Sequence, residues 1–293
     1  MYFEKLWFQY TVIFFLAFIW GSSFILMKIG LQSFSYEQVG ALRIVLASLV
    51  LMPLAIKNLK VLRKKDIKSL LVVSIIGGLI PSFLFTKAET RIDSALAGML
   101  NSLTPVFTLI IGMIFYEIKS NLRQLAGSLI GLAGAFLLLN EGESISLTEI
   151  NSYALFVVAA TICYSISVNE VKTHLTHLNG IELTSLSFMF AGPLALIYVL
   201  TTDFSPVFTH PDWLTGFAAI ASLGIIGSAL AMLFMNHLIR YVTPVFASSV
   251  TYVIPVFAIF WGIVAGEQIT LYQVTGMIII LIGIALINSK KRK

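Results

Sequence analysis

Long hydrophobic runs are the feature of this sequence that most restricts its fold. Each run has about 20 residues, the length that a helix needs to cross roughly 30 Å of hydrocarbon. With 58% hydrophobic and only 11% charged residues, the chain has too much apolar surface for a water-soluble core. We predict ten membrane-spanning helices, at residues 10–31, 37–57, 67–86, 93–116, 122–140, 151–172, 181–201, 213–237, 243–266 and 270–289.

Helices are expected instead of strands, because the runs lack the alternation of a barrel strand and lipid offers no partner for an open strand edge. The first run is too long for a signal-peptide core, and no small-residue cleavage motif follows it. We therefore expect it to be retained as a helix.

The basic residues predict the orientation. With the N-terminus inside, only Lys28, Lys87 and Arg91 lie outside, and Arg43 falls within the second helix. The remaining 15 of the 19 basic residues are then cytoplasmic: Lys5, Lys57, Lys60, Arg63, Lys64, Lys65, Lys68, Lys119, Arg123, Lys172, Arg240 and the tail from Lys290 to Lys293. The positive-inside rule thus places both termini in the cytoplasm. It also accounts for the net charge of +5 without a nucleic-acid partner.

The chain repeats part of its sequence after about 150 residues. The matching segments are TPVFTLIIGMIFYE (104–117) with IPVFAIFWGIVAGE (254–267), QLAGSLIGLAGAFLL (124–138) with QVTGMIIILIGIALI (273–287) and, weakly, WGSSFILMK (20–28) with YSISVNEVK (164–172). We therefore predict two related halves of five helices each, residues 1–145 and 146–293. Since five is odd, the second half must cross the membrane in the opposite sense, as an inverted-topology repeat. Such repeats suit alternating access around a site near the midplane.

This layout resembles the EamA family of the drug/metabolite transporter superfamily. The WGSSF stretch in the first helix and the Pro-Val-Phe segments that end in Glu117 and Glu267 carry the resemblance. It implies a transporter with a central cavity between the first, third, fourth, sixth, eighth and ninth helices. Many members export amino acids or other small metabolites, so the resemblance also implies export across a bacterial inner membrane.

Polar residues at helical spacing predict where a ligand binds. Two polar stripes each occupy one helix face: Ser94, Gly98, Asn101, Pro105 and Thr108 on the fourth helix, and Pro244, Ser248, Thr251 and Pro255 on the ninth. Aromatic residues near mid-depth add to them, because tryptophan usually lies at the headgroup level. Our predicted substrate-binding residues are Trp20, Ser22, Ser23, Asn101, Tyr164, Ser248, Thr251 and Tyr252. Hydrogen bonding between helices is the alternative for any single hydroxyl or amide.

Charged residues near the helix ends predict gates. Glu170 and His237 lie close in depth at the inner end, and Lys87 is the repeat counterpart of His237. Pro105 and Pro255 remove one backbone hydrogen bond each, and either free a carbonyl or kink the helix. We assign these five residues to gating or coupling. Interfacial charges without a specific role are the alternative.

Arg43, in contrast, is expected to snorkel or to pair with Glu37, Glu89 or Asp93. For Glu117 and Glu267 we expect turn and cap chemistry, next to capping-box spacings at Asn121 to Gln124 and Thr270 to Gln273. The glycines Gly127, Gly131, Gly134, Gly276 and Gly283 indicate close helix packing, either within the monomer or in a homodimer.

Several classes of function lack their residues in this sequence. Cys163 is the single cysteine, so neither a disulfide framework nor a thiolate metal site is expected. There is no HExxH, GxSxG or glycine-rich phosphate loop, and we expect no enzyme, cofactor or metal. No Asp or Glu falls at mid-depth, and the ninth and tenth helices have no basic residue before the tail. The predicted substrate is therefore a small neutral, zwitterionic or cationic metabolite. An uptake carrier, an exchanger and a non-transport scaffold or sensor remain alternatives to an exporter.

Overall fold

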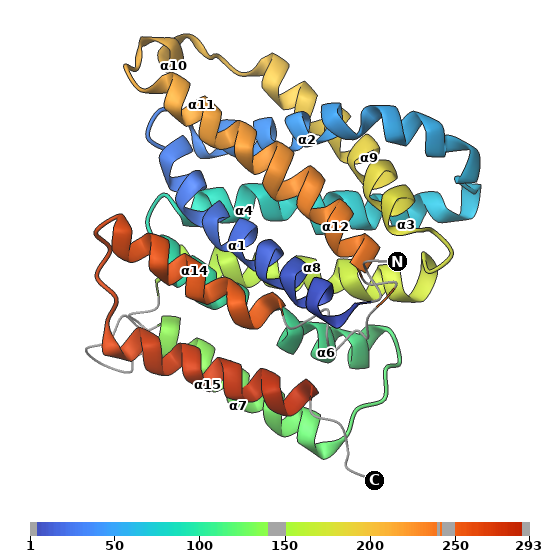
Figure 1. Ribbon diagram of the computed structural model, residues 1–293, viewed down its shortest axis with the longest axis vertical. Coiled ribbons are helices and arrows are strands. Elements are labelled where there is room, and N and C mark those ends of the chain that lie inside the picture. The colour runs from blue at the N-terminus through green and yellow to red at the C-terminus, as the bar shows by residue number, and fades with distance from the viewer. Residues whose placement is uncertain (1–4, 140–150, 239–240, 242–249, 289–293) are drawn as a thin grey trace.

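The computed structural model describes residues 5–139, 151–238, 241 and 250–288, and over these residues it is all-helical (Figure 1). Eight helical spans are long and apolar enough to cross a membrane, from Leu6–Gly30 to Trp213–Leu238. Two shorter apolar helices correspond to the predicted ninth and tenth helices. The predicted all-α membrane protein is confirmed at this level. Pro244 and Ser248 lie outside the described residues.

The helices follow the predicted order along the chain. The first half contains α1 (Leu6–Gly30), α2 (Tyr36–Asn58), η2 (Leu59–Val61), η3 (Lys64–Asp66), α3 (Ile67–Leu71), η4 (Val72–Leu79), α4 (Ile80–Ala88), α5 (Ser94–Asn101), α6 (Thr104–Phe115) and α7 (Leu122–Leu139). The second half contains α8 (Ala154–His174), α9 (Gly180–Thr201), α10 (Ser205–Thr209), α11 (Trp213–Ser222), η6 (Leu223–Leu230), α12 (Ala231–Leu238), α14 (Val250–Val264) and α15 (Leu271–Asn288).

Local sequence determines where several helices begin. Reciprocal side-chain to backbone hydrogen bonds form capping boxes between Ser35 and Gln38 before α2, Asn121 and Gln124 before α7, Asn179 and Glu182 before α9, and Thr270 and Gln273 before α15. Each box provides a partner for amide groups that the first helical turn leaves without an acceptor. The predicted boxes before α7 and α15 are confirmed.

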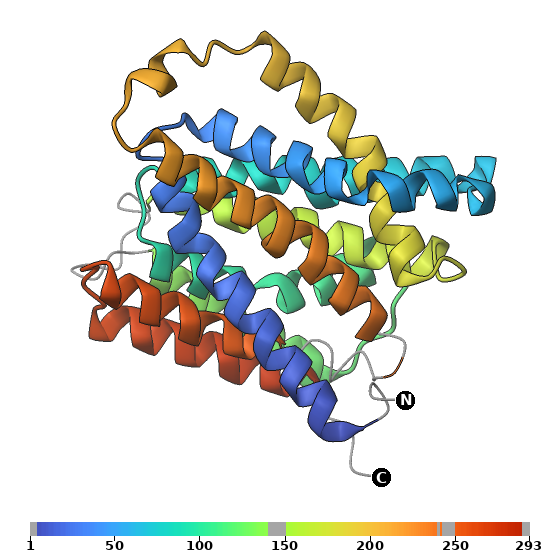
Figure 2. The same cartoon turned by 45° about the horizontal axis from the view of Figure 1, so that its top comes forward.

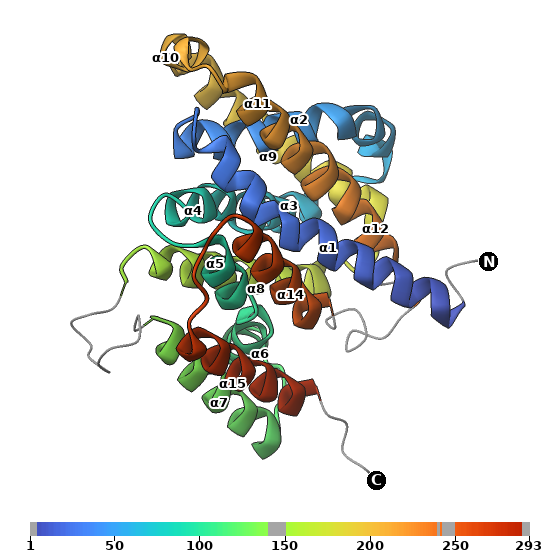
Figure 3. The ribbon, with the colours of Figure 1, turned by 60° about the vertical axis from the view of Figure 1, so that its left-hand side comes forward.

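Helices α7 and α15 lie side by side at one edge of the molecule, and α2 and α9 lie at the opposite edge (Figures 1 and 3). Glycines let α7 and α15 approach backbone to backbone. A Cβ on Gly127 would lie 2.6 Å from the carbonyl oxygen of Gly283, and one on Gly134 would lie 2.7 Å from that of Gly276. The structure therefore uses the predicted glycine stripes within one chain, as small residues are used between membrane helices.

The bundle has two ends, which we name after one residue each. The Lys28 end holds the turns that join α1 to α2, α4 to α5 and α14 to α15 (Figures 1 and 2). The Glu170 end holds the first turn of α1, the last turn of α8 and the connection from α6 to α7. The last turn of α15 also lies toward this end.

Matching helices in the two halves share an irregular backbone. The third helix of the first half and its counterpart in the second each contain eight π-helical residues, η4 and η6. These segments are related by a shift of 151 residues, close to the spacing of the sequence repeat. Isolated π-helical turns often mark functional positions, because they redirect side chains and loosen the backbone hydrogen-bond ladder.

Candidate functional site

A group of polar side chains meets inside the bundle around η6. Trp20 of α1 donates its indole N–H to the carbonyl oxygen of Gly227 at 3.0 Å. The next residue, Ser228, accepts a hydrogen bond from Nη2 of Arg43 at 3.2 Å. Gly224 allows this contact, because a Cβ there would lie 2.7 Å from the carbonyl oxygen of Arg43. Through η6, the eighth predicted helix therefore contacts both α1 and α2.

Arg43 corrects one of our expectations. We expected it to snorkel or to pair with a carboxylate near the Lys28 end, but its side chain is directed among α1, α8 and η6. Nη1 contacts the sulfur of Met27 at 3.6 Å, and Nε is buried without a hydrogen-bond partner. Tyr164 of α8 lies near the guanidinium, and no hydrogen bond joins the two side chains. No ion pair joins Arg43 to a carboxylate of the described residues.

Three predicted binding residues lie in this region. The Tyr164 ring stacks on Phe85 of α4 with centroids 5.8 Å apart, and Trp20 is half-buried beside Gly227. Ser23 is buried, donates to the carbonyl oxygen of Ile19, and faces η6. The structure therefore brings Trp20, Ser23 and Tyr164 into the neighbourhood of Arg43. We name Trp20, Arg43, Tyr164 and Ser228 the central cluster.

Two predicted binding residues have other neighbours. The hydroxyl of Ser22 accepts from the indole N–H of Trp261 on α14 at 2.7 Å and donates to the carbonyl oxygen of Phe18. The Tyr252 hydroxyl donates to the carbonyl oxygen of Ile284 on α15 at 3.3 Å. The contacts with Trp261 and Ile284 are hydrogen bonds between helices, the alternative that the sequence left open.

The fourth predicted helix is interrupted at Ser102 and Leu103, between α5 and α6. Because Pro105 has no N–H, the Asn101 carbonyl loses its helical donor, and the Thr104 hydroxyl binds it at 2.8 Å. The side-chain amide of Asn101 is half-buried and makes no hydrogen bond with any residue that the structure describes. An unbonded, partly accessible amide at a helix break is available to a ligand.

The second proline has a different setting. Pro255 lies inside α14, which continues on both sides of it. The carbonyl that it frees, that of Thr251, accepts a hydrogen bond from the Ser102 hydroxyl at 3.4 Å. The break before α6 therefore contacts the matching carbonyl of the other half. This contact joins the fourth predicted helix to the ninth, next to Asn101 of the predicted stripe.

A charged network connects the two halves of the chain at the Lys28 end. Nζ of Lys28 lies 2.9 Å from Oε1 of Glu267 and 3.2 Å from Oδ1 of Asp93. The same Glu267 carboxylate accepts the backbone N–H groups of Ser94 and Ala95, at 2.9 and 3.0 Å. Only 4% of the Glu267 side chain is exposed. Glu267 thus caps α5, a helix of the other half, as well as ending its own helix.

Two carboxyl groups of this network have opposite pKa shifts. Burial would raise the pKa of Glu267, but the N–H of Ala95 and the ammonium of Lys28 lower it below its usual value. Burial raises the pKa of Glu89 well above its usual range, although Lys28 and the Ser94 hydroxyl oppose this shift. Glu89 is buried, accepts from Ser94 through Oε2, and leaves Oε1 without a partner. Burial thus disfavours the ionised form of Glu89, in contrast to Glu267.

The residues that align with Lys28 and Glu267 behave differently at the Glu170 end. They are Lys172 and Glu117, and both are exposed, with no ion pair between them. Glu117 has a positive φ of 55°, in the left-handed region. Its backbone is therefore held in the turn, while its carboxylate caps no helix among the described residues.

Glu170, a predicted gating residue, has partners of its own. The Tyr116 hydroxyl donates to its Oε2 at 2.8 Å, and Nδ1 of His174 lies 3.1 Å from its Oε1. Burial, followed by the hydrogen bond to Glu170, raises the pKa of Tyr116 to about 12. The predicted partner His237 has its ring against Tyr241, with centroids 5.4 Å apart.

Lys87, the predicted outer gating residue, lies over two aromatic rings. Its Nζ is 4.8 Å from the ring centre of Phe156 and 5.5 Å from that of Tyr36. These distances suit cation–π contacts, which hold an ammonium group without a carboxylate.

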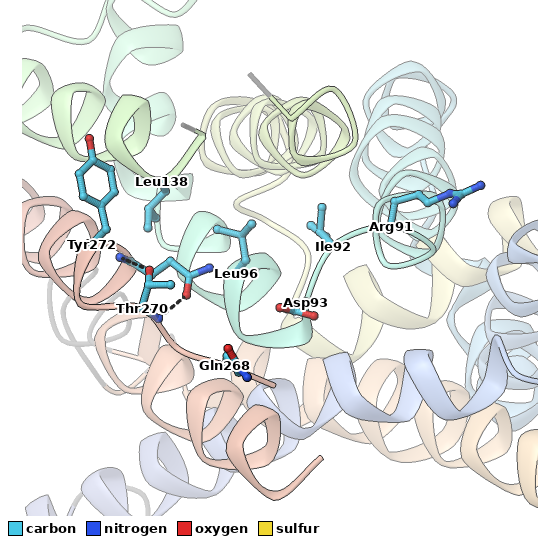
Figure 4. Close-up of a pocket in the computed structure, with 9 residues that line it drawn as sticks. Arg91, Ile92, Asp93, Leu96, Leu138, Gln268, Thr270 and Tyr272 are labelled. Atoms are coloured by element: carbon cyan, nitrogen blue, oxygen red, sulfur yellow. Dashed lines mark hydrogen bonds between the residues drawn. The ribbon is translucent and has the colours of Figure 1, made fainter. Parts of the chain in front are cut away.

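A pocket of about 310 Å³ opens at the Lys28 end, beside the charged network (Figure 4). The turn between α4 and α5, the end of α7 and the start of α15 surround it. Its lining consists of Arg91, Ile92, Asp93, Leu96, Leu138, Gln268, Thr270, Tyr272 and Gln273. Asp93 belongs both to this pocket and to the ion pair with Lys28, and 46% of its side chain is exposed. The pocket therefore reaches the network at Asp93, whereas Glu267 is not among its lining residues and only 4% of its side chain is exposed.

Sequence reasoning missed three functional candidates, Lys28, Arg43 and Ser228. A signal was present for Arg43, because an arginine within a span is costly and usually functional. Lys28 and Ser228 gave less warning, since a lysine at a helix end commonly snorkels and a serine commonly bonds its own backbone.

Residues 7–140 and 151–289 each match the EamA-like transporter family. An uncharacterized inner membrane transporter of Escherichia coli, YedA, is 27% identical over 99% of this chain and 94% of its own length. A probable terminal-alkyne amino-acid exporter of Streptantibioticus cattleyicolor is 23% identical, with coverage of 92% and 90%.

Two further similarities are informative. An S-adenosylmethionine/S-adenosylhomocysteine transporter of Chlamydia trachomatis is 25% identical over 88% of this chain and 82% of its own length. A solved crystal structure has a TM-score of 0.63 and 17% identity, covering 94% of this chain and 95% of the other. At that identity the structural likeness supports the fold alone.

Proposed function

Because the chain belongs to the EamA-like transporter family, we propose that this multi-pass inner-membrane transporter exports small organic metabolites by alternating access. In this proposal the two halves are inverted repeats of five helices. Matches of the family to each half, and π-helical segments at equivalent places, support the repeat. The family consists of transporters, so an enzymatic role has no support.

One observation carries the proposal. Two pairs of residues are aligned by the sequence repeat, and the pair at one end of the bundle forms an ion pair while the pair at the other end is exposed. Lys28 and Glu267 form an ion pair across the two halves, whereas the aligned Lys172 and Glu117 are both exposed. Inverted repeats can exchange such states, because each half can adopt the arrangement of the other. The structure then corresponds to a form closed at the Lys28 end.

The orientation of the bundle and the direction of transport rest on separate arguments. The positive-inside rule assigns the Lys28 end to the outside, since most basic residues lie toward the Glu170 end. The relative from Streptantibioticus cattleyicolor is named as a probable terminal-alkyne amino-acid exporter, which supports export of amino-acid-like compounds. An uptake carrier, an exchanger and a scaffold or sensor are the competing functions that the experiment below must exclude.

A metabolite profile tests this function. Medium and cytoplasm would be compared for cells that express the wild type, Asn101→Ala or an empty vector, at equal membrane abundance of both proteins. We expect one class of small metabolite to accumulate in the medium with the wild type, and less with Asn101→Ala. Accumulation inside the cells would reverse the direction. Unchanged profiles in both compartments would contradict constitutive export.

A further inference from the structure

Arg43 carries a charge that the described chain does not balance. It is the eighth residue of α2, about 10 Å along the helix from the Lys28 end at 1.5 Å per residue. Its hydrogen-bond partners are the Ser228 hydroxyl and the Met27 sulfur, both neutral. No ion pair with a carboxylate of the described residues involves it. A cation within a membrane-spanning helix is costly unless it has a partner.

The guanidinium also keeps hydrogen-bonding capacity in reserve. Arginine has five N–H donors in a planar fork, and thioether sulfur is a weak acceptor. The Arg43 contacts use one good acceptor and one weak one, and Nε is buried without any partner. A buried donor without an acceptor is unfavourable. The arrangement therefore favours an anionic acceptor that is not part of the chain.

The neighbours of Arg43 indicate what kind of anion fits. Trp20 donates a hydrogen bond to Gly227, the residue before Ser228, and the Tyr164 ring stacks on Phe85. Aromatic rings therefore lie near the guanidinium. A phosphate, with up to two negative charges, is usually held by several basic groups or by a helix N-terminus. Here the central cluster holds one arginine. The nearby Lys28 is already engaged by Glu267 and Asp93.

We propose that Arg43 binds the carboxylate of a small amino-acid-like substrate through its guanidinium fork, beside Ser228 and the rings of Trp20 and Tyr164. The inference rests on the proposed transport function and adds to it the residue that recognises the carboxylate. The carboxylate matches the planar fork of arginine, and the aromatic faces can receive an apolar side chain or an ammonium group by cation–π contact. Neutral amides and amines without a carboxylate are then poor ligands.

Binding to the purified protein in detergent tests the inference without transport. The unfolding temperature of the protein would be measured with each proteinogenic L-amino acid and with its carboxamide. The two ligands of a pair differ only in the carboxylate. We expect at least one amino acid to stabilise the wild type and its carboxamide to bind about 10- to 100-fold more weakly, the range for loss of a charged hydrogen bond. Equal stabilisation by acid and amide, or none by any amino acid, would overturn the inference.

Three variants locate the effect. Arg43→Gln should lose the preference for the acid, and Arg43→Lys should keep only part of it, because lysine lacks the fork. Arg63→Gln removes the same charge from an exposed position at the Glu170 end and should bind as the wild type does. Wild-type affinity and selectivity in Arg43→Gln would refute the role of Arg43. If Arg43→Gln does not fold, the affinities of the wild type and of Arg43→Lys for the amino acid and its carboxamide still test the role of Arg43.

Counterflow into proteoliposomes separates this inference from the proposed function. If the wild type binds the amino acid but moves none across the membrane, transport fails while the Arg43 site stands. If the wild type moves a compound without a carboxylate and Arg43→Gln moves it equally well, the Arg43 site is refuted while transport stands.

Discussion

At the Lys28 end a lysine of the first half holds a carboxylate of the second, whereas the aligned residues at the Glu170 end are exposed to solvent. The Glu267 carboxylate binds Lys28 and caps α5 at once, and only 4% of it is exposed. Glu117 and Lys172 make neither contact in the described residues. Similar local sequences therefore serve a shielded network at one end and a solvated turn at the other.

The difference shows that the contacts of a residue in this protein depend on how the two halves are placed. A carboxylate shielded from water gains from an ammonium group and from helix N–H groups, while an exposed one gains little. The fourth and ninth predicted helices differ as well, since one is interrupted before Pro105 and α14 continues through Pro255. We expect this asymmetry to be a conformational state, which substitutions at the two ends test.

Glu267→Ala should have the largest effect. It removes one partner of a shielded ion pair and the acceptors of two α5 N–H groups. The form closed at the Lys28 end should lose about 3 kcal/mol of stability. Asn101→Cys in a Cys163→Ala background would report opening through its reaction with a membrane-impermeant maleimide added outside. We expect labelling to accelerate at least ~10-fold. Glu117→Ala, the same change at the exposed counterpart, is the control and should leave the rate unchanged.

Glu89 should give the stability of the protein a distinct pH dependence. Because burial raises its pKa in the folded protein, the folded state holds the proton more tightly than the unfolded state. The free energy of unfolding should therefore fall as the pH rises from the usual carboxyl range to the raised pKa, by up to about 1.4 kcal/mol per pH unit. Thermal unfolding between pH 5 and 8 would measure this slope.

The Glu89 prediction has a matched pair of variants. Glu89→Gln should flatten the slope, whereas Glu117→Gln at the exposed turn should retain it. Glu267 contributes in the other direction, since its lowered pKa means that its stabilisation is lost as the pH falls. An unchanged slope in Glu89→Gln would show that the buried carboxyl is not the source.

Lys28→Met should open the Lys28 end less than Glu267→Ala does. The Glu267 carboxylate would still accept the N–H groups of Ser94 and Ala95, and the Lys28 side chain is already 34% exposed. A cost of about 1 kcal/mol, or a roughly fivefold faster external labelling at Asn101→Cys, is expected. Equal rates for both variants would assign the closure to the ion pair and leave no role for the cap on α5.

Tyr116→Phe, at the Glu170 end, should have the smallest effect, because it removes a single hydrogen bond. It removes the hydrogen bond to Glu170 and leaves His174 beside the same carboxylate. We expect about 0.5 kcal/mol or less in unfolding free energy and no change in external labelling at Asn101→Cys. A rate change as large as that of Glu267→Ala would place a closed gate at both ends and contradict the comparison.

The sequence by itself determined the features that depend on neighbours along the chain. Run length and hydropathy predicted the helices, and side chains three residues apart formed the capping boxes before α7 and α15. The matching segments of the two halves were also visible. These features rest on local hydrogen bonds and on the length of a helix that lipid requires, so they do not depend on tertiary contacts.

Tertiary structure alone decided which of these residues meet. It directed Arg43 toward Ser228 and away from the carboxylates expected for it, gave Glu267 to α5, and packed the glycines of α7 against α15. It also gave Ser22 and Tyr252 partners on other helices. Many neighbours of similar hydropathy surround a residue within an apolar helix, so hydropathy alone does not distinguish its possible contacts. Partner choice therefore follows from shape and from the position of each half, which no local pattern encodes.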